Sequence, residues 1–189
     1  METREAISET VEHLKKGEII LFPSDTIWGL SCDATNVEAV DRLIQLKGRA
    51  QHKSFIVLVN SDRMINQCIK DTPEVAWDMI DYTEEPLTLV LDDGQFVAPN
   101  AINQDGSLGI RKVQRGAINT LLSKFNKPII STSANFSGKL SALTFQEIDS
   151  ELKNQVDYTF PLEQKSKIKT HASKIVRIRS NGEVEILRK

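Results

Sequence analysis

The chain has 189 residues, of which 40% are hydrophobic and 26% charged, and its charged side chains give a formal net charge of -2 at pH 7. This length suits an ordinary hydrophobic core, so we expect residues 1–189 to form a single domain. The composition excludes a membrane protein, because no apolar run approaches the roughly 20 residues of a membrane span. With no signal-peptide pattern at the start, we expect a cytoplasmic protein.

Charge and cysteine content exclude two further classes of site. A net charge of -2 offers no global attraction for nucleic acid, so any basic site must be local. The two cysteines form no CxxC pair, and with only three histidines the sequence predicts no zinc cluster and no other metal ligands.

Helices and strands alternate in the first part of the chain. Apolar residues at helical spacing predict a helix over 4–16, followed by a buried strand over 19–22. Small polar residues between proline and glycine predict a shaped loop over 23–30. Asn36 is a good N-cap for a helix over 37–47, and a second apolar run predicts a strand over 55–59.

The second part continues the alternation. Its predicted elements are helices near 61–69 and 73–82, a strand over 87–91, a long loop, a strand over 107–112, a helix near 116–125 and a strand over 129–132. Thr144 and Glu147 match a capping box and predict a late helix. Alternating residues around Asn181 and Gly182 predict a C-terminal hairpin over 176–186. The pattern indicates one α/β domain with a mixed sheet.

Two polar clusters are candidate sites, and each has an ordinary structural explanation. Lys47, Arg49 and Lys53 lie at the C-terminus of a predicted helix and in the segment after it. Cations are favoured there by the helix dipole but could also bind an anion such as phosphate. Residues 127–138 form a strand followed by hydroxyl and amide groups, which suit either a polar ligand or a capped turn. No histidine is paired with a serine or cysteine in a way that suggests a nucleophilic triad.

Taken together, five segments resemble one family. They are PSDTIWGL (23–30), KGR (47–49), PLTLVL (86–91), GIR (109–111) and STSANFSG (131–138), and the resemblance extends over residues 4–188. The family is that of YrdC and Sua5, the threonylcarbamoyl-adenylate synthases. It implies the YrdC/RibB-like fold, a twisted α/β sheet with flanking helices around a basic cavity. The length matches the short, single-domain form.

The resemblance implies a nucleotidyl transfer. L-threonine, bicarbonate and ATP give threonylcarbamoyl-AMP and pyrophosphate, the first step toward N6-threonylcarbamoyladenosine in tRNA. Mg²⁺ accompanies ATP as part of the substrate, and tRNA is reached indirectly through a downstream threonylcarbamoyl transferase complex. Such a site needs positioning and positive charge, and no protein nucleophile.

The resemblance also implies roles for individual residues. Arg49 and Lys53 face the phosphates with Lys47 beside them, and these three are the expected catalytic residues. The expected threonine contacts are Thr26, Arg111, Ser133 and Ser173. The expected nucleotide contacts, besides Arg49 and Lys53, are Ser107, Asn135, Ser141 and Arg188.

Two alternatives stay open at this point. One is a binding protein of the same fold for double-stranded RNA or for ribosome maturation, which would bind RNA weakly given the net charge of -2. The other is a relative that forms a plain carbamoyl-adenylate. The chain also departs from the family pattern near its end, where Arg177 is a base at a position that usually holds an acid.

Overall fold

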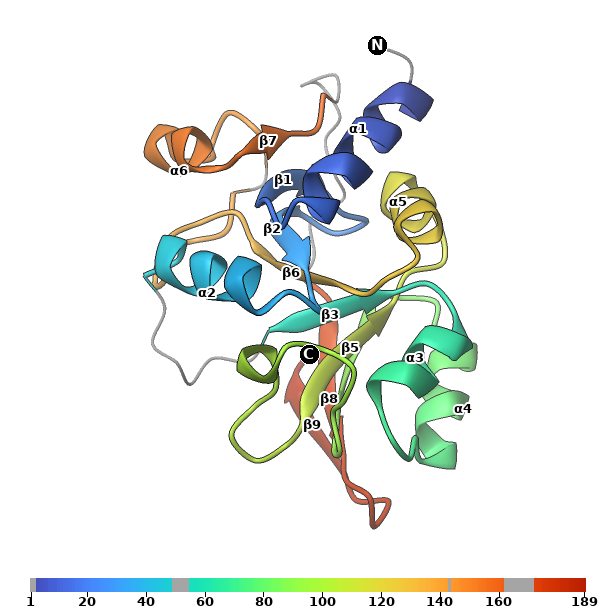
Figure 1. The fold of residues 1–189 in the computed structure, drawn as a ribbon. Coiled ribbons are helices and arrows are strands. Elements are labelled where there is room, and N and C mark those ends of the chain that lie inside the picture. Colours follow the sequence, from blue (N-terminus) through green and yellow to red (C-terminus); the bar gives the residue numbers. More distant parts are fainter. Residues whose placement is uncertain (1–2, 49–54, 143, 162–171) are drawn as a thin grey trace.

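A nine-stranded mixed sheet is the framework of the residues that the computed structural model describes, namely 3–48, 55–142, 144–161 and 172–189 (Figure 1). Its strands are β1 (Ile20–Pro23), β2 (Trp28–Asp33), β3 (Ile56–Val59), β4 (Leu87–Leu91), β5 (Leu108–Lys112), β6 (Ile129–Ser133), β7 (Tyr158–Thr159), β8 (Lys174–Ile178) and β9 (Val184–Arg188). Their spatial order is β7-β1-β2-β6-β3-β5-β4-β8-β9. The predicted α/β class with a twisted mixed sheet is confirmed.

Helices pack on both faces of this sheet. They are α1 (Thr3–Lys15), α2 (Val37–Leu46), α3 (Asp62–Cys68), α4 (Glu74–Tyr82), α5 (Ala117–Phe125) and α6 (Ser150–Gln155), with a short 3-10 helix η1 at Pro99–Ala101. Asn36 caps α2 as predicted, because its side-chain oxygen accepts from the Ala39 amide. Among the described residues, no helix is both long and apolar enough to cross a bilayer.

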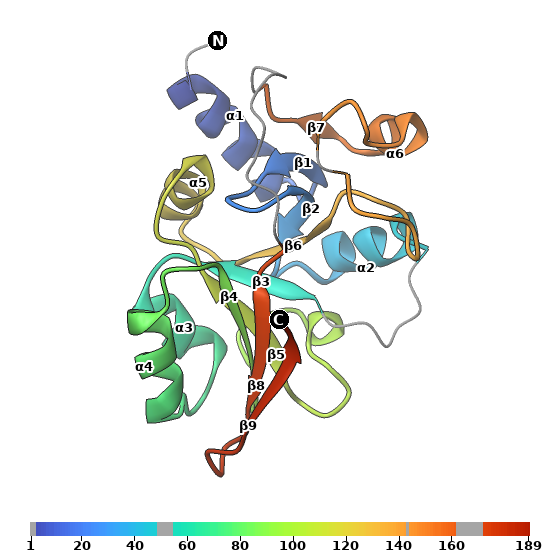
Figure 2. The same ribbon diagram turned by 180° about the vertical axis from the view of Figure 1, so that it is seen from behind.

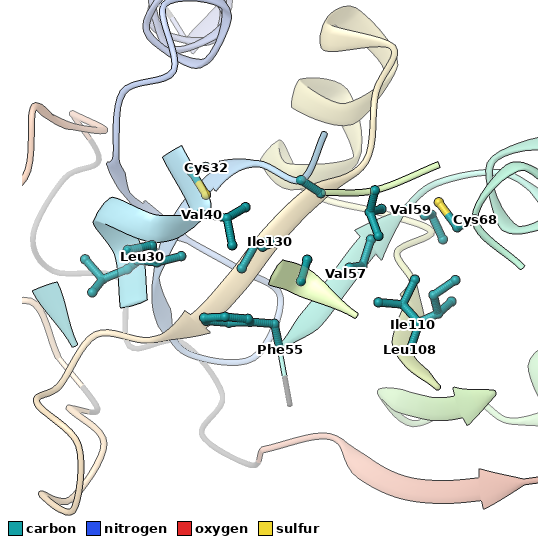
Figure 3. Close-up of a cluster of buried hydrophobic side chains, with 14 of the residues drawn as sticks. Leu30, Cys32, Val40, Phe55, Val57, Val59, Cys68, Leu108, Ile110 and Ile130 are labelled. Atoms are coloured by element: carbon teal, nitrogen blue, oxygen red, sulfur yellow. The ribbon is translucent and has the colours of Figure 1, made fainter. Parts of the chain in front are cut away.

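Alternation along the strands produces two separate hydrophobic cores, because successive side chains point to opposite faces. One core joins α2, α3 and α4 to residues such as Leu30, Val57, Ile110 and Ile130 (Figure 3). The other joins α1 and α5 to the opposite face through Phe22, Leu58 and Ile129. We call this opposite face, with the strand positions of Phe22, Leu58 and Ile129, the α1 face.

The first predicted loop is too long. Residues 24–27 form the turn, but Trp28–Asp33 is a fully buried strand that pairs with both β1 and β6. The prediction was wrong because this segment, WGLSCD, contains glycine, serine and cysteine in place of β-branched residues, so its strand propensity is low. Pairing on both sides overrides that local preference.

The late helix begins five residues after its predicted start, because its N-cap is Asp149 and not Thr144. Thr144–Glu147 is not helical, and α6 begins at Ser150 with Asp149 accepting from the Glu151 amide. The capping-box prediction was wrong because Asp149 is itself a good N-cap and lies next to the helix. The two-residue strand β7 was not predicted. It pairs in parallel with β1.

The C-terminal hairpin is confirmed. β8 and β9 pair antiparallel around Asn181 and Gly182, and Gly182 has a φ of +83° that suits glycine in a tight turn. Figure 2 shows this hairpin extending the sheet beyond β4, with which β8 pairs in parallel. β9 is therefore the edge strand on this side of the sheet.

Candidate functional site

Part of the α1 face carries small or polar side chains instead of large apolar ones. The strand register places Gly29 and Ser31 of β2 beside Ser133 and Ser131 of β6 on this face. On the other side of β3, the same face carries Arg111 of β5. Side chains of this kind supply the hydrogen-bonding groups that a polar ligand requires, so this region is the candidate site.

Arg111 is the centre of the first part of the site. Arg111 is only 4% exposed. Its guanidinium group donates from Nη1 to Thr26 Oγ1 (3.0 Å) and from Nη2 to Asp25 Oδ1 (2.9 Å). Both acceptors belong to the turn between β1 and β2. Ser24 Oγ lies 2.9 Å from Thr26 Oγ1 and accepts from the amides of Thr26 and Ile27. The turn is therefore ordered and holds Thr26 against Arg111.

The charge of Arg111 is only partly compensated. Burial lowers the pKa of Arg111 from its ordinary value, the Asp25 carboxylate opposes this shift, and the positive charge of Arg188 adds to it. Across the described ranges, Arg111 Nε is buried and has no hydrogen-bond partner. A buried donor without an acceptor is costly, and a bound carboxylate would satisfy it together with Nη2 in a forked pair.

Arg188 lies in the same row of the sheet as Arg111. From Nε and Nη2 it donates to the Ser173 carbonyl oxygen (3.0 and 2.7 Å), and the Ser173 hydroxyl lies 2.7 Å from Thr88 Oγ1. A β-bulge in β9 makes Arg188, and not Leu187, the partner of Ile175. Because a one-residue shift moves a side chain to the other face, the bulge turns Arg188 toward the α1 face.

Lys47, Ser133 and Asn135 form the second part of the site. Lys47 lies at the end of α2 and is 4% exposed. Its ammonium donates to the carbonyl oxygens of Ser133 (2.6 Å) and Asn135 and to Asn135 Oδ1 (3.3 Å). The Ala134 amide donates to the Trp28 carbonyl (3.0 Å), which fixes this segment beside the turn that carries Thr26.

The remaining predicted residues do not contact the groups around Arg111 and Lys47, or they lie outside the residues that the structure describes. Ser107 is buried on the α1 face at the start of β5, where its hydroxyl donates to Asp105 Oδ1 (2.6 Å). Asp105 in turn pairs with Arg177 (2.9 Å). Ser141 is exposed in the segment after β6. Arg49 and Lys53 lie outside the described residues.

Two residues of the site were missed by sequence reasoning. Asp25 lies in the PSDTIWGL segment but was not among the expected contacts, although it neutralises Arg111, and Thr88 was not considered. Thr88 is 1% exposed and is the one polar side chain in the apolar run LTLVL. A buried hydroxyl needs a hydrogen-bond partner, so that isolated threonine was the signal that could have identified it.

A metal cage is not part of the arrangement that the structure describes. Over residues 3–48, 55–142, 144–161 and 172–189, no group of three or more His, Cys, Asp or Glu side chains could hold a metal ion. Both cysteines are buried thiols. Burial raises the pKa of Cys68 to about 12 and that of Cys32 still further, so neither is an activated nucleophile.

Comparison with known proteins identifies the family. The Sua5/YciO/YrdC family model, which carries the description "Telomere recombination", matches residues 12–189. The chain belongs to this family. A relative from Buchnera aphidicola subsp. Baizongia pistaciae, named threonylcarbamoyl-AMP synthase, is 34% identical over 145 residues, which cover 75% of this chain and 78% of the relative.

Two solved structures of the Sua5/YciO/YrdC family share the fold. E. coli YciO superposes with a TM-score of 0.85 at 20% identity, over 100% of this chain and 90% of YciO. P. abyssi Sua5 complexed with L-threonine gives a TM-score of 0.80 at 22% identity, over 94% of this chain. The present chain spans about half of that Sua5 structure, 52% of its length.

Proposed function

We propose that this member of the Sua5/YciO/YrdC family is a threonylcarbamoyl-AMP synthase that acts in tRNA modification. The observation that carries the proposal is the hydrogen bond between Arg111 and Thr26, because it joins two of the five segments that the resemblance selected. The name of the Buchnera relative and the L-threonine bound by P. abyssi Sua5 support the same activity.

The reaction needs binding and charge. The threonine amine attacks bicarbonate and, with loss of water, gives a carbamate. A carbamate oxygen then attacks the α-phosphorus of ATP, and the bond to the pyrophosphate oxygen breaks. Every covalent step is between substrates, so the site acts by alignment and by electrostatic stabilisation of the developing negative charge.

Arg111 is the proposed ligand of the threonine carboxylate. Its buried Nε is free to donate, and Nη2 lies beside it, so the fork matches a carboxylate. Thr26 and Ser133 flank this position from the neighbouring turn and from the end of β6. The Ser173 hydroxyl is hydrogen-bonded to the Thr88 hydroxyl of β4, which links Ser173 to this part of the site.

The proposed nucleotide side depends on cations. Arg188 is held on the α1 face by the Ser173 carbonyl, and Arg49 and Lys53 follow α2 in the sequence. Mg²⁺ enters with ATP, as is usual for phosphoryl and nucleotidyl transfer. The product, threonylcarbamoyl-AMP, is a mixed anhydride that a downstream threonylcarbamoyl transferase complex uses on tRNA, and we place the protein in the cytoplasm.

The proposal is tested by steady-state kinetics of pyrophosphate release. Purified protein should release pyrophosphate from ATP only when threonine and bicarbonate are both present. Arg111→Lys retains the charge but loses the fork, so it should raise the KM for threonine by at least about tenfold while the KM for ATP stays within about twofold. Pyrophosphate release that does not depend on threonine would overturn the proposed substrate.

A further inference from the structure

The turn over residues 133–139 is built around two polar side chains that use their hydrogen-bonding capacity within the chain. The first is Lys47. An ammonium group has three N–H donors, and three oxygens of Ser133 and Asn135 surround Lys47 Nζ. The Ser137 amide also donates to the Lys47 carbonyl (3.1 Å), so both ends of this residue attach the turn to the end of α2.

Asn135 is the second of the two polar side chains around which the turn is built. Its Oδ1 accepts from Lys47 Nζ (3.3 Å) and from the Ser133 hydroxyl, and its Nδ2 donates to the carbonyl oxygens of Phe136 (3.1 Å) and Lys139 (2.5 Å). A side-chain amide offers two acceptor positions and two donors, so all four are used, one by Lys47 and three by groups of the turn. The positive charge of Lys47 also fixes the orientation of the Asn135 amide, because Oδ1 and not Nδ2 must face the ammonium group.

We infer that Lys47 and Asn135 are positioning residues, which hold the 133–139 turn so that the Ser133 hydroxyl faces the substrate, and that neither contacts the phosphates of ATP. This inference rests on the proposed function for the identity of the ligand. It changes the assignment of Lys47 from a catalytic cation beside the phosphates to a group that acts through Ser133. Burial supports this assignment, since Lys47 is 4% exposed and donates to the carbonyl oxygen of Ser133 at the end of β6 and to that of Asn135 just after it.

The two roles predict different losses in ligand affinity. A phosphate ligand interacts with ATP more strongly than with AMP, so its removal weakens ATP binding more. A positioning residue acts on the shape of the site, and its removal weakens threonine binding while the ratio of the AMP and ATP dissociation constants stays unchanged. If Lys47 and Asn135 act as one unit, their substitutions are also non-additive.

The experiment measures the dissociation constants of threonine, AMP and ATP by calorimetry for the wild type, Lys47→Met, Asn135→Ala and the double variant. We expect each single variant to weaken threonine binding by about tenfold, the double variant to weaken it no further, and the AMP-to-ATP ratio to stay within about twofold. Lys139→Met is the matched control. Lys139 is an exposed lysine of the same turn that pairs with Asp149, and its substitution should change no constant by more than about twofold.

Two outcomes of the binding experiment overturn the inference. One is a loss of ATP affinity about tenfold greater than the loss of AMP affinity in Lys47→Met. The other is multiplicative losses in the double variant, which would mean independent contacts with ligand.

Hydrogen exchange in the absence of ligand separates failure of this inference from failure of the proposed function. The inference expects amides of residues 133–139 to exchange at least about tenfold faster in Lys47→Met and in Asn135→Ala than in the wild type, with α1 and α5 unchanged. If the wild type binds no threonine, the proposed function fails, and the exchange rates still decide whether the two residues hold the turn. Unchanged exchange in both variants would overturn the positioning role.

Discussion

Arg111 and Thr26 are 85 positions apart in the sequence and are joined by a hydrogen bond of 3.0 Å between Nη1 and Oγ1. Neither residue is informative alone, because an arginine on a strand and a threonine in a turn are common. Together they form a buried pair of a cation and a hydroxyl, with Asp25 as the counter-charge. This contact joins β5 to the turn between β1 and β2.

Thr26→Val should destabilise the protein and weaken its ligand binding. Valine has nearly the same shape but cannot accept from Arg111 Nη1, which leaves a buried donor without an acceptor at a cost of about 1–3 kcal/mol in the free energy of unfolding. Urea unfolding measures this loss. Thr120→Val, at an exposed position of α5, is the control and should change the free energy by less than about 0.5 kcal/mol. Equal effects of the two substitutions would contradict a structural bond between Thr26 and Arg111.

Asp25→Asn should cost more stability than the same change at an exposed ion pair. The Arg111 side chain is 5% exposed and would lose its counter-charge, so we expect a loss of about 1–3 kcal/mol. Asp62→Asn is the matched control, because Asp62 pairs with Lys112 at 2.6 Å but is 61% exposed, and surface pairs contribute about 0–1 kcal/mol. Thermal unfolding of the two variants tests the difference, and a larger loss at Asp62 would refute it.

The Asp105 carboxylate gives a pH dependence with a definite sign. A hydrogen bond from Ser107 is the main cause that lowers the pKa of Asp105 from 3.8 to about 2. Because the pKa in the folded state is depressed, the contribution to stability is present above about pH 4 and is lost as the pH falls toward 2. The side chain is 50% exposed, so we expect at most about 1 kcal/mol.

Ser107→Ala removes that hydrogen bond. The pKa of Asp105 should return toward 3.8, which carboxyl-carbon NMR measures directly. The free energy of unfolding of the variant should therefore fall less between pH 4 and pH 2 than that of the wild type. An Asp105 pKa of about 2 in the variant would show that Ser107 is not the main cause.

Arg49→Ala should lower the rate of adenylate formation. Residue 49 lies outside the described residues, and the prediction rests on the resemblance of the KGR segment. Loss of a charge-assisted hydrogen bond to phosphate costs about 1.5–3 kcal/mol, which corresponds to about a 10- to 100-fold fall in rate. Arg63→Ala, which removes an exposed arginine of α3, is the control. Unchanged kinetics of a folded Arg49→Ala protein would remove Arg49 from the site.

The sequence predicts the fold well where periodicity is strong. The apolar run at 87–91 and the Asn181-Gly182 turn give the correct strand and hairpin, because hydrophobic alternation and turn chemistry are local properties. β2 could not be predicted in the same way, since its small residues become a strand only by pairing with β1 and β6. α6 was placed too early, because two capping signals lie within six residues.

The site is predictable in composition but not in geometry. Resemblance selected Thr26, Arg111, Ser133 and Ser173, and the structure brings Thr26 and Arg111 into contact. Sequence alone could not show that Asp25 neutralises Arg111, or that a bulge in β9 directs Arg188 to the α1 face. Both relationships depend on which face a side chain occupies, and that is set by long-range register. Arg177 illustrates the same limit, because its partners Asp92 and Asp105 lie in distant segments.

The central claim is that this chain makes threonylcarbamoyl-AMP. The most direct test incubates the protein with ATP, magnesium and isotopically labelled bicarbonate, with threonine present or withheld, and identifies the nucleotide product by mass spectrometry. We expect a labelled adenylate that contains threonine and forms only when threonine is present. Label in an adenylate that forms without threonine would instead indicate a plain carbamoyl-adenylate, and the absence of any labelled adenylate from folded, ATP-binding protein would contradict the account.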